Sequence, residues 1–130
     1  MGMAANIIIV IVGLLHVYFL VLEMFLWAKP LGLKTFRNTP EKAEITKVLA
    51  ANQGLYNGFL ASGLLWSVFA PSPRPAIQLR MFFLCCVSVA GIFGGITVRP
   101  TLFFVQGLPA LITLALVLVS SKSASSASPS

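Results

Sequence analysis

Two ionisable residues stand inside the first apolar run of the chain. Only three of the 130 residues are acidic and only one is a histidine. Residues 4–27 hold both that histidine, His16, and the acid Glu23, seven positions later. At about 3.6 residues per turn, this spacing puts them on nearly one line of a helix. Because a carboxyl group at membrane depth is costly and usually functional, the pair predicts a proton-handling site, provided that both side chains point into a bundle.

A second set of polar side chains falls in later apolar runs. The set consists of Asn52, Gln53, Tyr56 and Asn57 in one run and Gln106 in another. The first four occupy one broad helical face beside Gly54 and Gly58, small residues that let another helix approach closely. We expect the set to hold and polarise a substrate oxygen.

A structural interpretation competes with this chemical one. The amides could serve only to join helices, each contributing about 1 kcal/mol. Glu23 could lie at the membrane interface beside a loop lysine, and His16 could donate a hydrogen bond between helices.

Four apolar runs position these side chains, at residues 4–27, 45–69, 79–98 and 102–119. Hydrophobic residues make up 58% of the chain and charged residues 9%, whereas about a quarter of a soluble domain is charged. Spanning a bilayer takes about 20 apolar residues per helix. We therefore expect an all-α fold, an integral membrane antiparallel four-helix bundle. It would form one domain over residues 1–119, followed by a disordered Ser/Ala-rich tail at 120–130.

The breaks between these runs carry helix signals and most of the charge. Thr39 and Pro40 predict a helix start, as the cap and the first-turn residue. The net charge is +6, and the excess of Lys and Arg around residues 28–44 predicts that this loop is cytoplasmic, with both termini on the opposite side.

The same patterns indicate the partners. Membrane lipid and a small lipophilic substrate are expected, and nucleic acid is not, because no soluble basic face exists to bind it. A homodimer through the glycine-rich helix faces is a further expectation. One histidine and the adjacent Cys85 and Cys86 are too few ligands for a zinc or iron centre. We expect neither a metal nor a cofactor.

Several of these segments resemble domain-of-unknown-function family 1304. The similarity lies in residues 15–20 (LHVYFL), 22–27 (LEMFLW), 51–60 (ANQGLYNGFL), 89–94 (VAGIFG) and 106–110 (QGLPA). It covers residues 9–118, which excludes the Ser-rich tail. The resemblance implies a compact four-helix membrane protein and brings no activity with it.

Three functions fit these residues. The first is an intramembrane acid–base enzyme for epoxide opening, isomerisation or cyclisation of a small lipophilic substrate, with Glu23 as general acid or base and His16 relaying or orienting the proton. The second is a proton-coupled small-molecule exporter that works as a dimer around Glu23. The third is a non-catalytic membrane assembly factor, whose polar residues would all be used in bonds between helices.

Overall fold

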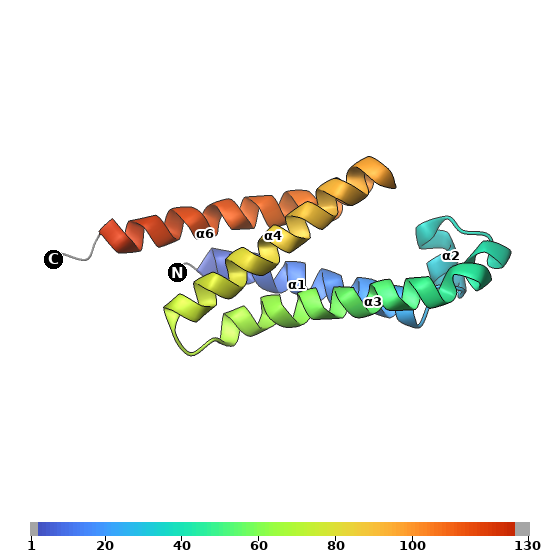
Figure 1. Ribbon diagram of the computed structural model, residues 1–130, viewed down its shortest axis with the longest axis horizontal. Helices are drawn as coiled ribbons and strands as arrows, with labels where there is room; N and C mark the ends of the chain where they lie inside the picture. Colours follow the sequence, from blue (N-terminus) through green and yellow to red (C-terminus); the bar gives the residue numbers. More distant parts are fainter. Residues whose placement is uncertain (1–2, 127–130) are drawn as a thin grey trace. The chain divides into compact units, whose positions relative to one another are not determined.

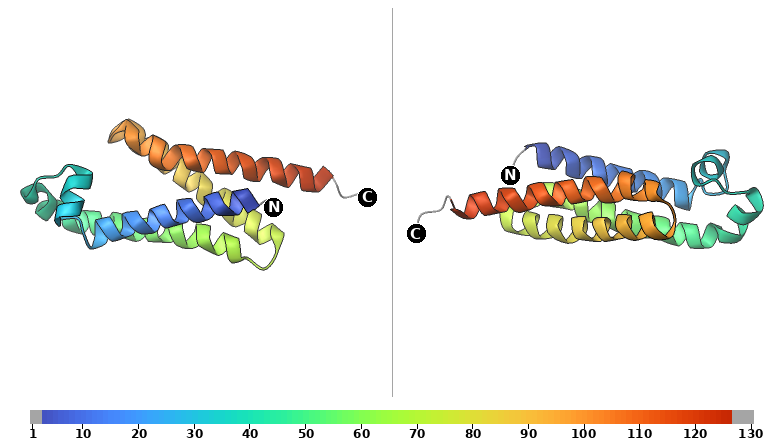
Figure 2. Two further views of the ribbon diagram at one scale, coloured as in Figure 1. Left: turned by 180° about the vertical axis from the view of Figure 1, so that it is seen from behind. Right: turned by 90° about the horizontal axis from the view of Figure 1, so that it is seen from above.

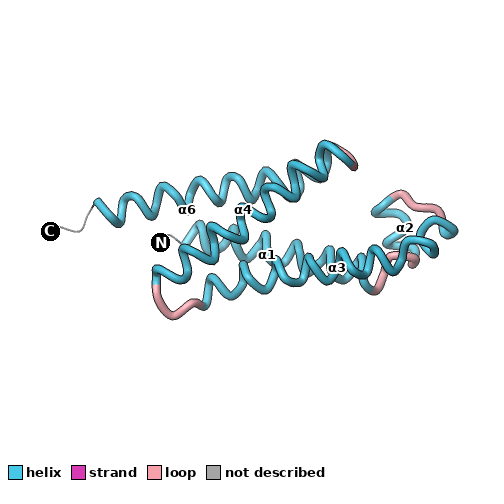
Figure 3. Tube along the Cα trace, in the orientation of Figure 1, coloured by secondary structure: helices cyan, strands magenta, loops and turns pink. Residues whose placement is uncertain are grey.

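The protein is built from helices throughout the part that the structure describes. The computed structural model describes residues 3–126, and no strand occurs among them (Figure 3). The elements in Figure 1 are α1 (Met3–Met24), α2 (Pro30–Phe36), α3 (Pro40–Phe69), α4 (Pro73–Thr97), α5 (Pro100–Leu102), the π-helix η1 (Phe103–Gly107) and α6 (Leu108–Ser126). The expected all-α fold is confirmed.

The chain divides into two compact units. The hairpin unit is Leu14–Ala61 and contains the second half of α1, all of α2 and most of α3. The second unit combines Met1–Gly13 with Ser62–Ser130 and contains α4, α5, η1 and α6. We call this second unit the α4–α6 unit.

In the hairpin unit, α1 and α3 pack against each other in opposite directions. Gly54 lies against Glu23 and Met24, whereas Gly58, one turn further along α3, lies against Leu20, one turn earlier on α1. The missing side chains at the two glycines let the helix backbones approach closely. The segment that joins α1 to α3 was expected to be a polar loop, but it contains the short helix α2.

Three contacts hold α2 in place. The α-carbon of Gly32 lies directly under the carbonyl oxygens of Leu26 and Trp27, where a β-carbon would collide with them. The Trp27 ring packs on Phe36 with centroids 4.6 Å apart, and its Nε1–H donates to Thr46 Oγ1 at 3.0 Å. Because these partners lie outside α2, packing rather than the propensity of its own residues fixes this seven-residue helix.

The start of α3 follows its local sequence signals. The Lys42 N–H donates to Thr39 Oγ1 at 3.3 Å, and Pro40 is the first helical residue. A hydroxyl at the cap satisfies one of the free N–H groups of the first turn, where proline has no hydrogen bond to lose. The expected helix start is confirmed.

In the α4–α6 unit, α4 returns through a tight turn to α5, η1 and α6. The views in Figure 2 show α4 and α6 running alongside each other from this turn. Gly91 meets the backbone of Gly107, and Gly95 meets Phe103. Pro109 lacks the N–H that would bond the carbonyl four residues earlier, and just before it the chain widens so that the Leu108 N–H reaches the Phe103 carbonyl.

Both ends of the α4–α6 unit extend beyond the expected helix limits. Helix α4 begins at Pro73 rather than at residue 79, because prolines in a first turn lose no intrahelical bond. Helix α6 continues to Ser126; of the tail expected to be disordered, residues 127–130 lie outside the described residues.

Three helical stretches among the described residues are long and apolar enough to cross a membrane. They are Met3–Met24, Pro73–Thr97 and Pro100–Ser123. Many large apolar side chains on them are exposed, Phe93 and Ile96 of α4 among them, as expected of surfaces that face lipid. These features fit a membrane protein. Helix α3 has 30 residues but is more polar, so the fourth crossing stays a prediction.

Candidate functional site

The hairpin unit joins Glu23 of α1 to Asn57 of α3. The side-chain Nδ2 of Asn57 donates to Glu23 Oε2 at 2.6 Å, and both residues are half-buried. The two residues are 34 positions apart in sequence, so the contact exists only because the hairpin closes. It joins two of the residues that the sequence marked as candidate site residues.

The glycines of α3 create the space for this contact. A β-carbon on Gly54 would lie 2.7 Å from Met24 Cγ and 3.1 Å from both Glu23 Cβ and the Leu20 carbonyl oxygen. On Gly58 it would lie 2.7 Å from Leu20 Cδ1. Larger residues at either position would push α1 away from α3, and Asn57 would then reach less far toward Glu23.

The carboxyl group of Glu23 is anchored at one oxygen only. Asn57 bonds Oε2, and no described residue donates to Oε1. Lys47 forms an ion pair with Glu44, away from the site, whereas Glu23 binds the Asn57 amide. A carboxyl group held in this way can exchange a proton at its second oxygen while its orientation stays fixed.

His16 is fully buried two turns before Glu23 on α1. Its ring meets Phe19 edge-on, with centroids 6.0 Å apart. Two turns of helix correspond to about 10 Å along the axis, so proton exchange between the two residues requires intervening groups. The shared helix face is as expected, whereas the relay role stays a prediction.

The other polar residues of α3 do not gather around Glu23. Asn52, Gln53 and Tyr56 are all exposed, and the Tyr56 ring packs edge-on against Phe59, with centroids 5.8 Å apart. Successive helical residues turn by about 100°, which places Asn52 on the side of α3 opposite to Gly54. Of the broad polar face expected from the sequence, only Asn57 reaches the carboxyl group.

Gln106 belongs to the other unit. It lies in η1, half-buried, one residue before the glycine that packs on α4. The π-helical turn around it is of a kind often found at functional sites. Its convergence on Glu23 stays a prediction.

One buried polar contact was not expected from the sequence. Arg80 is 4% exposed, and its Nη2 donates to the Ser67 carbonyl oxygen at 3.2 Å, near the end of α3. The signal that could have revealed it is Pro73, which starts α4 early enough to place Arg80 in its second turn.

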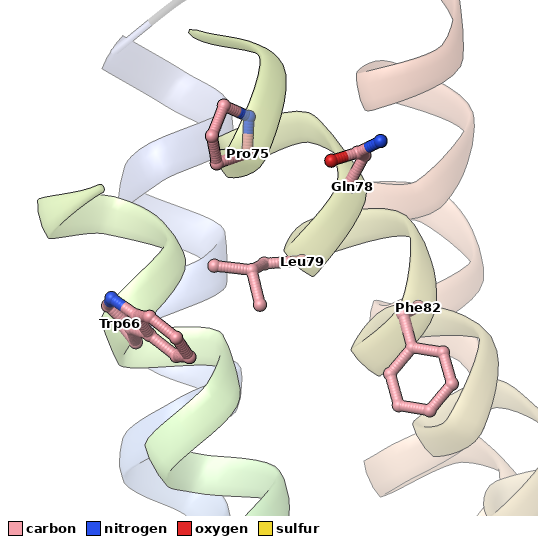
Figure 4. A pocket seen from close by; sticks show the side chains of 5 residues that line it. All are labelled: Trp66, Pro75, Gln78, Leu79 and Phe82. Atoms are coloured by element: carbon pink, nitrogen blue, oxygen red, sulfur yellow. The ribbon is translucent and has the colours of Figure 1, made fainter. Parts of the chain in front are cut away.

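The α4–α6 unit also contains an open pocket of about 300 Å³. Figure 4 shows its lining, Trp66 from α3 with Pro75, Gln78, Leu79 and Phe82 from α4. Gln78 supplies the one polar side chain among these five. None of the expected site residues lines this pocket.

One family model matches most of the chain. Residues 10–118 match the sequence model described as "Protein of unknown function (DUF1304)". The chain is also similar to the uncharacterized protein YpaA of Lactococcus lactis subsp. lactis (strain IL1403), with 29% identity over 106 residues. That alignment covers 80% of this chain and 87% of YpaA. No solved structure matches the chain.

Proposed function

The chain belongs to the DUF1304 family, and we propose that it is an intramembrane acid–base enzyme that acts on a small lipophilic substrate at Glu23. One observation carries the proposal: the 2.6 Å hydrogen bond from Asn57 to Glu23 Oε2, which leaves Oε1 without a donor among the described residues. A residue that only joins two helices needs the hydrogen bond to Oε2 and nothing more. A general acid or base needs a carboxyl group that is fixed in place and also an oxygen that is open to the reactant.

The proposed chemistry assigns one role to each of the two residues. Glu23 transfers a proton to or from the substrate through Oε1, as in epoxide opening, isomerisation or cyclisation. Asn57 is a positioning residue, because its amide fixes the direction in which Oε1 points. Groups that fix a reacting atom in this way lower the entropic part of the barrier.

Some of the remaining candidates take supporting roles in this proposal. His16 orients or relays the proton along the inner face of α1. Gln53 and Gln106 offer hydrogen bonds to a substrate oxygen. Asn52 and Tyr56 lie on the side of α3 opposite to Gly54 and take no part in the proposed chemistry. The proposal also includes α3 as a fourth membrane crossing, with loop 28–44 on the cytoplasmic side.

The test uses the full chain in lipid nanodiscs, incubated in deuterated water with a total lipid extract from the expression host. Mass spectrometry then compares the extract before and after incubation. We expect a lipophilic component to gain deuterium or change mass with the wild-type protein, and the rate to fall about 100- to 10,000-fold in Glu23→Gln, the range typical of a lost general acid or base. The matched control is Glu44→Gln, which alters an exposed acid outside the site.

A chemical probe tests the site itself. Dicyclohexylcarbodiimide, a lipophilic reagent for carboxyl groups, should label Glu23 in the wild-type protein, and this label should be absent from Glu23→Gln. A folded Glu23→Gln protein that processes the extract at the wild-type rate would remove Glu23 from the chemistry.

The exporter gives a different result in vesicles. If Glu23 supports proton-driven movement of tetraphenylphosphonium across proteoliposomes while every component of the extract keeps its mass, the enzyme proposal is wrong and transport replaces it. Movement of this cation that persists in Glu23→Gln counts against the exporter.

A further inference from the structure

The outer side of α3 in the hairpin unit carries a regular stripe of exposed side chains. Its members are Ile45, Leu49, Asn52, Tyr56 and Phe59, and all five are exposed. Their spacing alternates four and three residues, which is the repeat that forms the seam of a coiled coil. We call this stripe the α3 seam.

The opposite side of α3 carries the residues that pack within the chain. Ala43, Ala50, Gly54 and Ala61 are buried, and Gly54 lies against α1. At about 100° per residue, these four positions fall within a narrow arc directly opposite the α3 seam. Helix α3 therefore has two opposite faces, a small-residue face and the α3 seam. The small-residue face packs against α1 inside the hairpin unit, and the α3 seam stays exposed.

The centre of the α3 seam is polar. Asn52 lies between Leu49 and Tyr56, and apolar side chains continue the stripe on both sides. An amide that faces hydrocarbon has no hydrogen-bond partner there, and polar side chains of membrane helices accordingly tend to bond across to a neighbouring helix. The group that covers Asn52 must therefore offer both a donor and an acceptor at the same depth.

We propose that the α3 seam binds the α3 seam of a second copy of this chain, with the two Asn52 amides bonded to each other. An amide both donates and accepts, so Asn52 is its own complement across a two-fold axis. Copies inserted in the same orientation place residue 52 at equal depth on parallel helices. A single asparagine within an apolar heptad seam also fixes the register and the number of strands.

This interface differs from the glycine-rich faces that the sequence suggested for a dimer. Gly54 and Gly58 already lie against α1 of the same unit, whereas the α3 seam is exposed. The inference rests on α3 crossing the bilayer, which belongs to the proposed function, and it does not depend on the chemistry of Glu23.

Cross-linking tests the interface in lipid vesicles. In a Cys85→Ser, Cys86→Ser background, Tyr56→Cys places a thiol in the centre of the α3 seam, and Leu55→Cys places an exposed thiol outside the seam, about 100° around the helix from residue 56. We expect mild oxidation to give covalent dimers with Tyr56→Cys and at least about fivefold less dimer with Leu55→Cys, since only the seam brings two copies within disulfide range. Monomeric Tyr56→Cys, or equal yields from the two variants, would overturn the proposal.

Energy transfer between dye-labelled copies tests the amide. Asn52→Leu keeps the seam apolar but removes the bond and should weaken association by about 3- to 30-fold, the range for polar contacts between membrane helices. Asn52→Gln keeps an amide and should retain most of the association. Unchanged association in Asn52→Leu would also overturn the proposal. Glu23→Gln leaves the α3 seam intact. If that variant still dimerises but has lost turnover, the interface and the proposed chemistry are independent of each other.

Discussion

Enlarging Gly54 offers a graded test of how the α1–α3 hairpin holds Glu23. A methyl group there would lie 2.7 Å from Met24 Cγ and 3.1 Å from Glu23 Cβ, whereas non-bonded carbon atoms prefer about 3.5–4.0 Å. The Met24 side chain can swing aside, but Glu23 Cβ and the Leu20 carbonyl oxygen are fixed to the backbone of α1. Gly54→Ala therefore requires α1 to move away by about 0.5 Å.

The hydrogen bond at the site can absorb that much movement. From 2.6 Å, it would lengthen to about 3.1 Å, still within the range of an N–H···O bond. Overpacking costs about 1–3 kcal/mol, and alanine recovers about 1 kcal/mol of helix propensity over glycine. We expect Gly54→Ala to lower the free energy of unfolding by about 0–2 kcal/mol and to keep the site working at a reduced rate.

Gly54→Leu cannot be absorbed in the same way. Its longer side chain forces a larger separation, and Asn57 then loses Glu23. Two measurements read this out: the free energy of unfolding in mixed micelles, and the nitrogen chemical shift of the Asn57 side-chain amide in bilayers, which reports its hydrogen bond. Val48→Leu is the control, because Val48 is exposed on the same helix. A Gly54→Leu protein with the wild-type amide shift and wild-type stability would refute the reasoning.

Two further predictions concern the other close contacts. A double-mutant cycle with Glu23→Ala and Asn57→Ala should give a coupling energy of about 0.6–1.7 kcal/mol in unfolding measurements, as for other bonds between membrane helices; strictly additive effects would show that the contact contributes nothing. Gly91→Ala should destabilise the fold by more than about 3 kcal/mol, because its β-carbon would collide with the backbone of Gly107. Gly94→Ala should be nearly neutral, because its β-carbon would meet only a leucine side-chain tip at 3.1 Å. Thermal unfolding of the two variants checks this, and an equal loss of stability in Gly91→Ala and Gly94→Ala would contradict the contacts described.

Features encoded within a few residues were predictable from the sequence. The apolar runs predicted the long helices because each run is long enough to form its own helix, and Thr39 and Pro40 predicted a start that depends on a single turn. The proximity of Glu23 and Asn57 was also accessible, because Gly54 and Gly58 mark the face of α3 on which another helix can lie closely.

Features set by contacts outside the element itself were not predictable in this way. Helix α2 depends on Gly32 fitting beneath the carbonyl oxygens of Leu26 and Trp27, and its own sequence is too short to be helical alone. The glycine face of α3 could receive any of the other helices, and the sequence of α3 alone does not state that α1, which carries Glu23, is the helix that packs there.

The meeting of Gly91 with Gly107 has a mechanical consequence. At this point α4 and η1 touch backbone to backbone, with only hydrogen atoms on the facing α-carbons. Sliding α4 by one turn in one direction would bring Val87 or Ser88 onto Gly107, where no room exists for a β-carbon. A ligand can therefore tilt or carry the two helices together, but slippage in that direction is blocked.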